Sequence, residues 1–282
     1  MAITKEGTAA TNEPYPSSDS DHTVTHAGWK ITTRKLPILK AGPIEEMTEK
    51  LGIAPPEMIF GDNLVRVEHL ASGWSIEFNA FDALDLVDKT GDTMLKVSYS
   101  KEWQQSRENK YDDADIKGVV KPFDWSYSTP YSGTVSTDSS SASSSPSFAP
   151  ITTPIPLELL KRPDPILFFD DVMLYEDELA DNGMSMLSGK IRVMPARLLL
   201  LCRFFMRLDD VVFRIRDTRV FVEFKTGEVI REYTAREEKF EAVRERFAGR
   251  RAEDASAAMR DANKLAEYLP VVEQRLEGLV LK

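Results

Sequence analysis

Turn signals recur at nearly even spacing between residues 166 and 235, and this spacing restricts the fold more than any other feature of the chain. The turn signals are Asp181-Asn182-Gly183, Pro195-Ala196, Asp209-Asp210, Asp217-Thr218 and Thr226-Gly227. They come roughly every 8–14 residues, and the runs between them are apolar or alternate between apolar and polar residues. Strands joined by short turns in this way form an antiparallel meander. Together with helix signals elsewhere, the spacing predicts an α+β fold built on antiparallel sheet.

Residues 197–208 predict which side of one strand in this meander is buried. The even-numbered positions, from Leu198 through Cys202 to Leu208, are all apolar, whereas arginines occur among the odd-numbered positions. Successive side chains of a strand point to opposite faces, so one face should be core and the other half-buried. Cys202 falls on the apolar face, which predicts a packing role for its thiol rather than a nucleophilic one.

Helix signals lie on both sides of the meander. Residues 43–51 have Pro43 at the start and Gly52 after the end, which predicts a short helix. Asn79 can cap a second helix whose first turn contains Asp82. Residues 234–237 read Thr-Ala-Arg-Glu, which fits a capping box and predicts the start of a C-terminal helix. Further expected elements are strands at 29–36, 64–69, 75–78 and 94–99 and a helical turn or two at 101–107.

The length of 282 residues fits one large domain or two small ones. Residues 1–25 are mostly small and polar, so they are expected to be disordered. Nine of the nineteen residues from 132 to 150 are serine, which predicts a flexible insertion. Since such an insertion can leave and rejoin one sheet, we expect a single domain over residues 26–282. A phosphorylated regulatory loop is the alternative interpretation of the serines.

The charge balance argues against a nucleic-acid or membrane partner. The chain has 36 basic and 46 acidic side chains, and its net charge of −10 repels phosphate backbones and anionic lipids. By contrast, residues 197–251 carry more basic than acidic side chains. The most apolar run, at 198–206, is too short to span a bilayer. A single cysteine and an N-terminus without a secretory signal favour the cytoplasm, with access to the nucleus left open.

The sequence shows no recognisable catalytic motif. Walker loops, dinucleotide fingerprints, kinase signatures and nucleophile elbows are absent, and neither a cofactor nor a metal is expected. The carboxylates between residues 170 and 181 offer the side chains of a metal-dependent enzyme, which is an alternative function. They lack the spacing and central glycine of a calcium loop, so a solvated acidic face is the favoured interpretation.

Arginines on the predicted meander admit two interpretations. They are Arg192, Arg203, Arg207, Arg214, Arg216, Arg219 and Arg231. In the first interpretation they pair with carboxylates on neighbouring strands. In the second their guanidinium groups bind an acidic or carboxylate-ending peptide. The second predicts that reversing the charge of Arg203 or Arg214 weakens partner binding and leaves the melting temperature nearly unchanged.

Eight segments give the chain a family resemblance. They are PEMIFGDNLVRVEH (56–69), SIEFNAFDAL (75–84), MLKVSYSKEWQQSR (94–107), VVKPFDWSYSTPYSGT (119–134), LYEDELADNGMSMLSGKIRVMP (174–195), RFFMRLDDVVFRIRDTR (203–219), IREYTARE (230–237) and EYLP (267–270). In these segments, which occur in the family's order, the chain resembles the TOR signalling pathway regulator-like family, eukaryotic proteins that bind type 2A protein phosphatases. The Ser-rich insertion and the N-terminal tail depart from the animal members and look like a fungal elaboration.

The resemblance implies a regulator without catalytic activity of its own. Its partners would be the catalytic subunits of type 2A, 4 and 6 protein phosphatases, with a link to the phosphatase-associated adaptor downstream of the TOR kinase. Such proteins are regarded as inhibitory or assembly-controlling partners. The implied fold is α+β, with antiparallel sheets packed together and helices around them. A scaffold whose phosphorylated Ser-rich loop recruits a partner is the other alternative function.

The resemblance also places phosphatase-binding positions on this sequence. These positions fall on Asp82, Ile155, Ile215 and Asp217. Asp82 has a competing role at a helix start, and Asp217 has one in a hairpin turn. Ile215 alternates with the arginines on either side of it, so it is expected in the core.

Charge alone adds Arg203 and Arg214 to the predicted partner-binding residues. Both lie in the basic stretch of the chain, where they are candidates to receive an acidic tail of the phosphatase catalytic subunit. A specific interface with that subunit would bury ~1,600 Å² in total.

Overall fold

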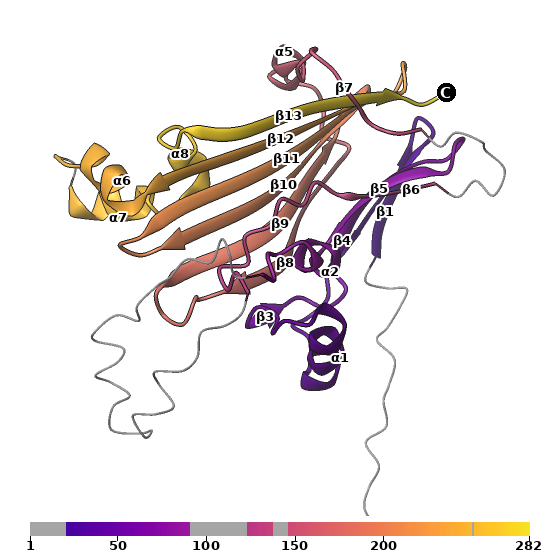
Figure 1. The fold of residues 1–282 in the computed structure, drawn as a ribbon. Helices are drawn as coiled ribbons and strands as arrows, with labels where there is room; N and C mark the ends of the chain where they lie inside the picture. The colour runs from indigo at the N-terminus through magenta and orange to yellow at the C-terminus, as the bar shows by residue number, and fades with distance from the viewer. Residues whose placement is uncertain (1–20, 91–122, 138–145, 250) are drawn as a thin grey trace, which may run out of the picture.

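Two antiparallel sheets build the fold, which is shown in Figure 1. The computed structural model describes residues 21–90, 123–137, 146–249 and 251–282. Within these ranges it contains a five-stranded sheet, an eight-stranded sheet and short helices around them. The predicted α+β fold with packed antiparallel sheets is therefore confirmed. None of the helices in these ranges has both the length and the apolar composition needed to cross a bilayer.

The small sheet has the strand order β1-β2-β4-β5-β6. Its strands are β1 (Asp21–His26), β2 (Trp29–Arg34), β4 (Leu64–His69), β5 (Trp74–Asn79) and β6 (Thr134–Thr137). β1 contradicts the expectation that residues up to 25 are disordered. Ala27 and Gly28 both adopt positive φ, at 50° and 84°, and close a tight hairpin that pairs β1 with β2. This pairing orders a polar strand that has no apolar period of its own.

The large sheet has the strand order β3-β8-β9-β10-β11-β12-β13-β7. Its strands are β3 (Met58–Ile59), β7 (Ala149–Pro150), β8 (Phe168–Asp177), β9 (Gly183–Val193), β10 (Arg197–Leu208), β11 (Val212–Glu223), β12 (Glu228–Lys239) and β13 (Val271–Val280). From β8 to β13 each strand pairs antiparallel with the next one along the chain. The predicted meander is confirmed.

Two boundaries predicted within this meander are wrong. Asp217 and Thr218 lie in the middle of β11, where Asp217 is opposite Arg203 of β10, so they make no turn. Residues 234–237 belong to β12, and α6 (Phe240–Arg246) begins only after Lys239, whose side chain makes no capping hydrogen bond. Pairing with β11 along the whole of β12 outweighs the small contribution of one capping box.

The remaining helices are α1 (Ala41–Leu51), α2 (Ala80–Asp85), α5 (Leu157–Leu160), α7 (Ala252–Ala258) and α8 (Ala262–Leu265). α1 starts two residues before the predicted position, and it ends as predicted at Gly52, whose φ is 70°. The cap of α2 is confirmed, because the backbone N–H of Asp82 donates to Asn79 Oδ1 at 2.8 Å. The strand and helix expected at 94–99 and 101–107 lie outside the described residues.

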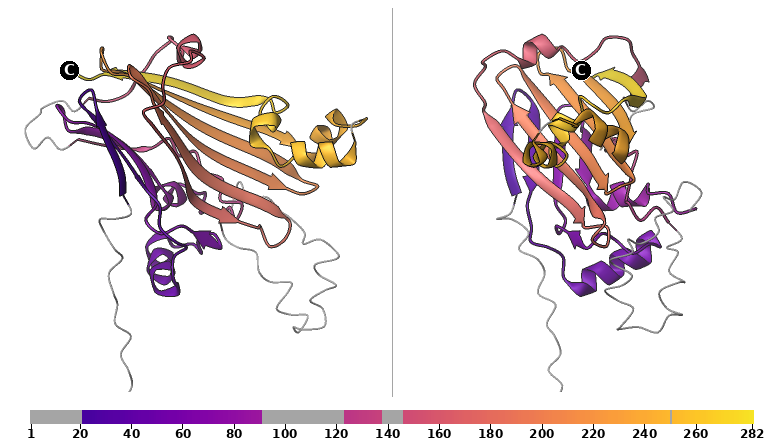
Figure 2. Two further views of the ribbon diagram at one scale, coloured as in Figure 1. Left: turned by 180° about the vertical axis from the view of Figure 1, so that it is seen from behind. Right: turned by 90° about the vertical axis from the view of Figure 1, so that its left-hand side faces the viewer.

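The small sheet packs on one face of the large sheet, which we call the inner face. Six buried side chains of β10 form part of this core, as the even-position pattern predicted: Leu198, Leu200, Cys202, Phe204, Met206 and Leu208. The opposite, outer face of the large sheet is covered at one end by α6, α7 and α8. Figures 1 and 2 show these helices at the end of the strands farther from the small sheet. Gly189 lets the sheets approach, since a Cβ there would lie 2.9 Å from Val65 Cγ2.

The Ser-rich insertion connects the two sheets. Its first part forms β6, at the edge of the small sheet, and its last part forms β7, at the edge of the large sheet. The expectation that it leaves and rejoins one sheet is therefore wrong, and ordered strands extend into both ends of the predicted range of 132–150. Phe148 lies between the sheets. Its ring centroid is 6.0 Å from that of Trp74 and 4.0 Å from the guanidinium carbon of Arg231. Residues 138–145 lie outside the described residues.

Candidate functional site

The six predicted partner-binding residues lie in three separate places. Four of them, Ile155, Arg203, Ile215 and Asp217, belong to the outer face of the large sheet. Arg214 belongs to the inner face, and Asp82 lies in α2 beside the small sheet. Neighbouring residues of one strand point to opposite faces, so Arg214 and Ile215 cannot lie in one surface patch.

On the outer face, Arg203 and Asp217 form a buried ion pair. Arg203 Nε donates to Asp217 Oδ1 at 2.6 Å, and Arg203 Nη2 donates to Asp217 Oδ2 at 2.7 Å. The side chain of Asp217 is 4% exposed, and that of Arg203 is 13% exposed. The remaining nitrogen of Arg203, Nη1, donates to Asn263 Oδ1 of α8 at 2.7 Å. This pair therefore connects two strands to the C-terminal helices.

The two isoleucines of the outer face are core residues. Ile215 is fully buried, as predicted, and packs in one apolar cluster with Phe205, Phe213 and residues of α6 to α8. Ile155 is buried against Phe221 in a second small cluster of the outer face. Neither side chain presents an exposed surface in this structure. Replacing either isoleucine would therefore affect a partner by changing the shape of the surface above it.

On the inner face, Arg214 joins a loop to the large sheet. Arg214 Nε donates to Glu237 Oε2 at 2.8 Å, and Arg214 Nη1 donates to Ser128 Oγ at 3.0 Å. Arg216 Nη2 also donates to Glu237 Oε2, at 2.9 Å. Burial favours the neutral form of Glu237, but the two guanidinium groups outweigh it and lower the pKa of this carboxyl. Arg203 on the outer face and Arg214 on the inner face are thus both paired with carboxylates, as the first interpretation of the arginines predicted.

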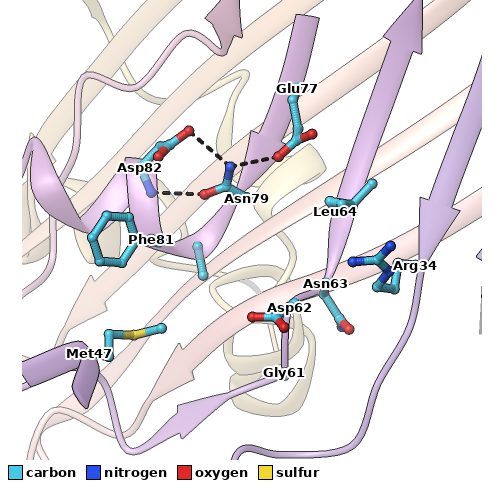
Figure 3. Close-up of a pocket in the computed structure, with 11 residues that line it drawn as sticks. Arg34, Met47, Gly61, Asp62, Asn63, Leu64, Glu77, Asn79, Phe81 and Asp82 are labelled. Carbon is cyan, nitrogen blue, oxygen red and sulfur yellow. Dashed lines mark hydrogen bonds between the residues drawn. The ribbon is translucent and has the colours of Figure 1, made fainter. Parts of the chain in front are cut away.

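Asp82 lies at the edge of a pocket of about 310 Å³, shown in Figure 3. Asn79 Nδ2 donates to Asp82 Oδ2 at 2.9 Å and to Glu77 Oε1 at 2.9 Å, so one amide group holds both carboxylates. Thr134 Oγ1 of β6 donates to the same oxygen of Asp82 at 2.5 Å. The predicted role of Asp82 at the helix start is confirmed by these contacts. The same contacts also fix the orientation of its carboxylate.

The rest of the pocket lining combines apolar side chains with further charges. Met47, Leu64 and Phe81 contribute apolar surface, and Asp62 adds a third carboxylate. Phe81 is 36% exposed, so part of its ring is accessible to a partner. Arg34 is paired with Asp21 through two hydrogen bonds, at 2.6 and 3.0 Å, which lower the pKa of Asp21. The pocket therefore carries negative charge.

The carboxylates between residues 170 and 181 do not meet at one place. Asp170 is buried and accepts a hydrogen bond from Thr33 and pairs with Lys35, whereas Asp171 pairs with Lys190. Asp177, at the far end of β8, accepts from the backbone N–H groups of residues 57 and 179. Within the described ranges, no group of three or more metal-binding side chains converges. These contacts argue against the metal-dependent alternative.

Sequence reasoning missed most of this pocket. Asp62 and Glu77 lie fifteen positions apart in the sequence, on different elements, and neither received a role from the segments that carry the family resemblance. The one local signal was the cap at Asn79, which predicted the helix start but not the second hydrogen bond to Glu77. A hydrogen-bond count for the Asn79 side chain could have indicated it, because an amide N–H₂ has two donors to satisfy.

A family model described as the TIP41-like family matches residues 58–244. The chain belongs to the TIP41-like family. This confirms the resemblance seen in the sequence segments. The TIP41-like match contains all six predicted partner-binding residues and most of the pocket lining.

Relatives in the TIP41-like family align along most of this chain. A TIP41-like protein of Dictyostelium discoideum is 41% identical over 258 residues, which cover 90% of each chain. The type 2A phosphatase activator TIP41 of Saccharomyces cerevisiae is 42% identical over 262 residues, covering 88% of this chain and 72% of the relative. The type 2A phosphatase activator tip41 of Schizosaccharomyces pombe is 30% identical over 251 residues, covering 89% of this chain and 95% of the relative.

Proposed function

We propose that this chain is a regulator of type 2A-group protein phosphatases that binds their catalytic subunits and carries out no chemistry of its own. The observation that supports this most is the match to two relatives named type 2A phosphatase activators, over 88% and 89% of this chain. The proposal extends to the type 4 and type 6 catalytic subunits, to the adaptor downstream of the TOR kinase, and to action in the cytoplasm and nucleus.

The direction of regulation is part of the proposal. The family resemblance implies inhibition of the bound catalytic subunit, whereas the two yeast relatives are named phosphatase activators. We propose inhibition within the binary complex. A turnover assay on a phosphopeptide, with purified catalytic subunit and increasing amounts of this chain, decides the sign. Turnover that rises with added chain would contradict inhibition and leave the binding proposal intact.

Three features of the structure fit a binding role for the pocket at Asp82. The carboxylate of Asp82 is half-exposed and held by hydrogen bonds from Asn79 and Thr134, so it is oriented before a partner arrives. Pre-orientation lowers the ordering cost of association. An exposed aromatic side chain, Phe81, lies next to it. Exposed aromatic residues beside fixed polar groups are typical of interface anchors.

The binding experiment compares two aspartates of α2. Asp82→Asn removes one of the three carboxylate charges that line the pocket. We expect it to weaken binding of the type 2A catalytic subunit about tenfold in calorimetry. Asp85→Asn is the matched control, because Asp85 is exposed on the same helix and pairs with Lys89 at 2.8 Å. It should bind within about twofold of the wild-type protein. Equal effects of the two substitutions would contradict a role of Asp82 at the interface, and no binding by the wild-type chain would contradict the proposed function.

The scaffold alternative has its own test. Deleting residues 138–145 removes six of the seven serines between β6 and β7 without removing either strand. We expect this deletion to leave binding to the catalytic subunit unchanged. Loss of binding in the deletion variant, with the melting temperature retained, would favour recruitment through the Ser-rich loop.

Arg203 and Arg214 have a more limited role in this proposal than charge alone predicted. Each is already paired with a carboxylate, Asp217 or Glu237, inside the protein. An acidic tail of the catalytic subunit would have to join or displace these carboxylates to reach either guanidinium. We therefore propose that both arginines contribute by holding their segments in place, and that the tail binds them only as a third partner.

A further inference from the structure

We propose that the pocket beside Asp82 takes up an arginine side chain of the phosphatase catalytic subunit, and that Asp62 is its principal charge partner. This inference rests on the proposed function and names the chemistry of one contact within it.

Charge decides what kind of group the pocket accepts. Three carboxylates line it, from Asp62, Glu77 and Asp82, together with one guanidinium, from Arg34. Arg34 is already engaged by both carboxylate oxygens of Asp21, and its charge also acts on Asp62 and Glu77. One guanidinium therefore offsets only part of the charge of the three carboxylates. Besides its hydrogen bond from Asn79, Glu77 makes a long ion pair with Arg66, at 3.9 Å. An incoming cation would therefore be attracted, and an incoming anion repelled.

Among these carboxylates, Asp62 is the one left open for a partner. Asp82 Oδ2 and Glu77 Oε1 accept hydrogen bonds from Asn79, as Figure 3 shows, so one oxygen of each is occupied. Asp62 is exposed, and within the described part of the chain its carboxylate has neither a hydrogen bond nor an ion pair; the charge of Arg34 acts on it from a longer distance. A charge-assisted contact is stronger than one between neutral groups, so this open carboxylate can add the most on binding.

Although its side chain is free, the backbone that carries Asp62 is fixed. Gly61 before it has a φ of +53°, and a Cβ there would come within 2.5 Å of Leu36 Cβ. Asn63 after it is buried and accepts from the backbone N–H of Leu36 at 2.5 Å while donating to the carbonyl of Met173 at 2.7 Å. The turn is therefore anchored on both sides. A partner would not have to order it.

The shape and lining favour arginine over a bare cation. Met47, Leu64 and Phe81 give the pocket apolar surface, against which the aliphatic stem of a long side chain can pack. A planar guanidinium offers five donors, which suits a pocket whose carboxylates come from different elements. A metal ion would need closely spaced ligands, and the described residues contain no such group.

The principal test is charge reversal at Asp62. Asp62→Lys should weaken binding of the purified type 2A catalytic subunit about 30-fold in calorimetry, and Asp62→Asn should weaken it less. Glu253→Lys is the matched control, since Glu253 is an exposed residue of α7 and the change in net charge is the same. It should bind within about twofold of the wild-type protein. Equal affinities of Asp62→Lys and Glu253→Lys would overturn the inference while leaving the proposed function intact.

A second measurement needs no phosphatase. The full chain is titrated with N-acetyl-arginine methylamide and followed by nuclear magnetic resonance, with N-acetyl-citrulline methylamide as the neutral control of nearly the same shape. We expect the arginine probe to shift the side-chain amide of Asn79 and the backbone amide of residue 62, and the citrulline probe to leave them in place. Equal shifts with both probes, or none with the arginine probe, would overturn the inference. N-acetyl-lysine methylamide acting as strongly as the arginine probe would overturn the choice of arginine.

Discussion

The two faces of the large sheet are built from the same strands but hold the molecule together in different ways. The inner face packs against the small sheet through a continuous apolar core that reaches from β10 to Trp29 and Trp74. The outer face packs against three short helices through a smaller apolar cluster. There the Arg203–Asp217 ion pair and its contact to Asn263 lie beside the helices. One face therefore relies on apolar area, and the other adds a buried polar connection.

Arg203 and Arg214 illustrate what this difference teaches. In the sequence both are arginines of one basic stretch. In the structure Arg203 is the main partner of a buried carboxylate on the outer face, whereas Arg214 shares Glu237 with Arg216 on the inner face. The stability that each arginine contributes thus depends on how many other cations contact its carboxylate partner. Replacing Arg203 and replacing Arg214 should therefore have unequal effects.

The largest expected effect compares Phe204 with Phe205, adjacent residues of β10 that are both 1% exposed. Phe204→Ala opens a cavity in the core between the sheets and should lower the free energy of unfolding by ~3–5 kcal/mol, measured by denaturant titration. Phe205→Ala should mainly increase hydrogen exchange in residues 240–269, because these helices can open without separating the sheets. Faster hydrogen exchange throughout both sheets in Phe205→Ala would contradict the independent opening of the helices.

A smaller effect on the free energy of unfolding is expected when Arg203 and Arg214 are replaced one at a time. Arg203→Ala leaves Asp217 buried with only a long contact to Arg219, at 3.8 Å, and should lower the free energy of unfolding by about 3 kcal/mol. Arg214→Ala leaves Glu237 paired with Arg216. It also removes a 3.6 Å contact to the buried Asp124, which keeps its two hydrogen bonds from Ser126, so the substitution should cost about 1 kcal/mol. This expectation replaces the earlier one that altering either charge leaves the melting temperature nearly unchanged.

A double variant checks the cause of that loss. Removing both charges in Arg203→Ala/Asp217→Ala should restore part of the stability, since no carboxylate is then left buried without its partner. Additive losses from the two single substitutions would show that the outer face does not depend on the pair.

The smallest expected effect is a pH dependence on the inner face. The pKa of Glu237 is lowered from its ordinary value of 4.5, so its contribution to stability is present above that value and lost as the pH falls below it through the folded-state pKa. Glu237→Gln should therefore flatten the loss of stability in acid, measured by denaturant titration at several pH values. Glu228→Gln, on the outer face of the same strand, is the control and should leave the acid dependence of the wild-type protein unchanged.

Several elements could be predicted from the sequence because their signals are local. The turns at 195–196, 209–210 and 226–227, the even-position core of β10 and the cap at Asn79 each depend on residues a few positions apart. The polar pair at 217–218 misled this reasoning. Its carboxylate is neutralised by Arg203, fourteen positions away, and that partner becomes a neighbour only through the register of β10 and β11.

The candidate site was predictable only in part, for the same reason. Asp82 came from the family resemblance, but the pocket around it is assembled from four places in the chain, contributed by Arg34, Met47, Asp62 and residues 77–82. No spacing rule connects these positions. Buried Ile155 shows the reverse case, in which the family resemblance named a position and the structure placed it beneath the surface.

By itself, the sequence determined the meander, the face of β10 that is buried and the family to which the chain belongs, because periodicity, turn residues and shared segments are properties of consecutive residues. The tertiary structure alone decided that the Ser-rich insertion joins the two sheets, that Arg203 and Arg214 lie on opposite faces, and that Asp62 meets Glu77 and Asp82 around one pocket. Strand register and sheet packing bring such residues together, and both depend on the free energy of the whole core rather than on any short segment.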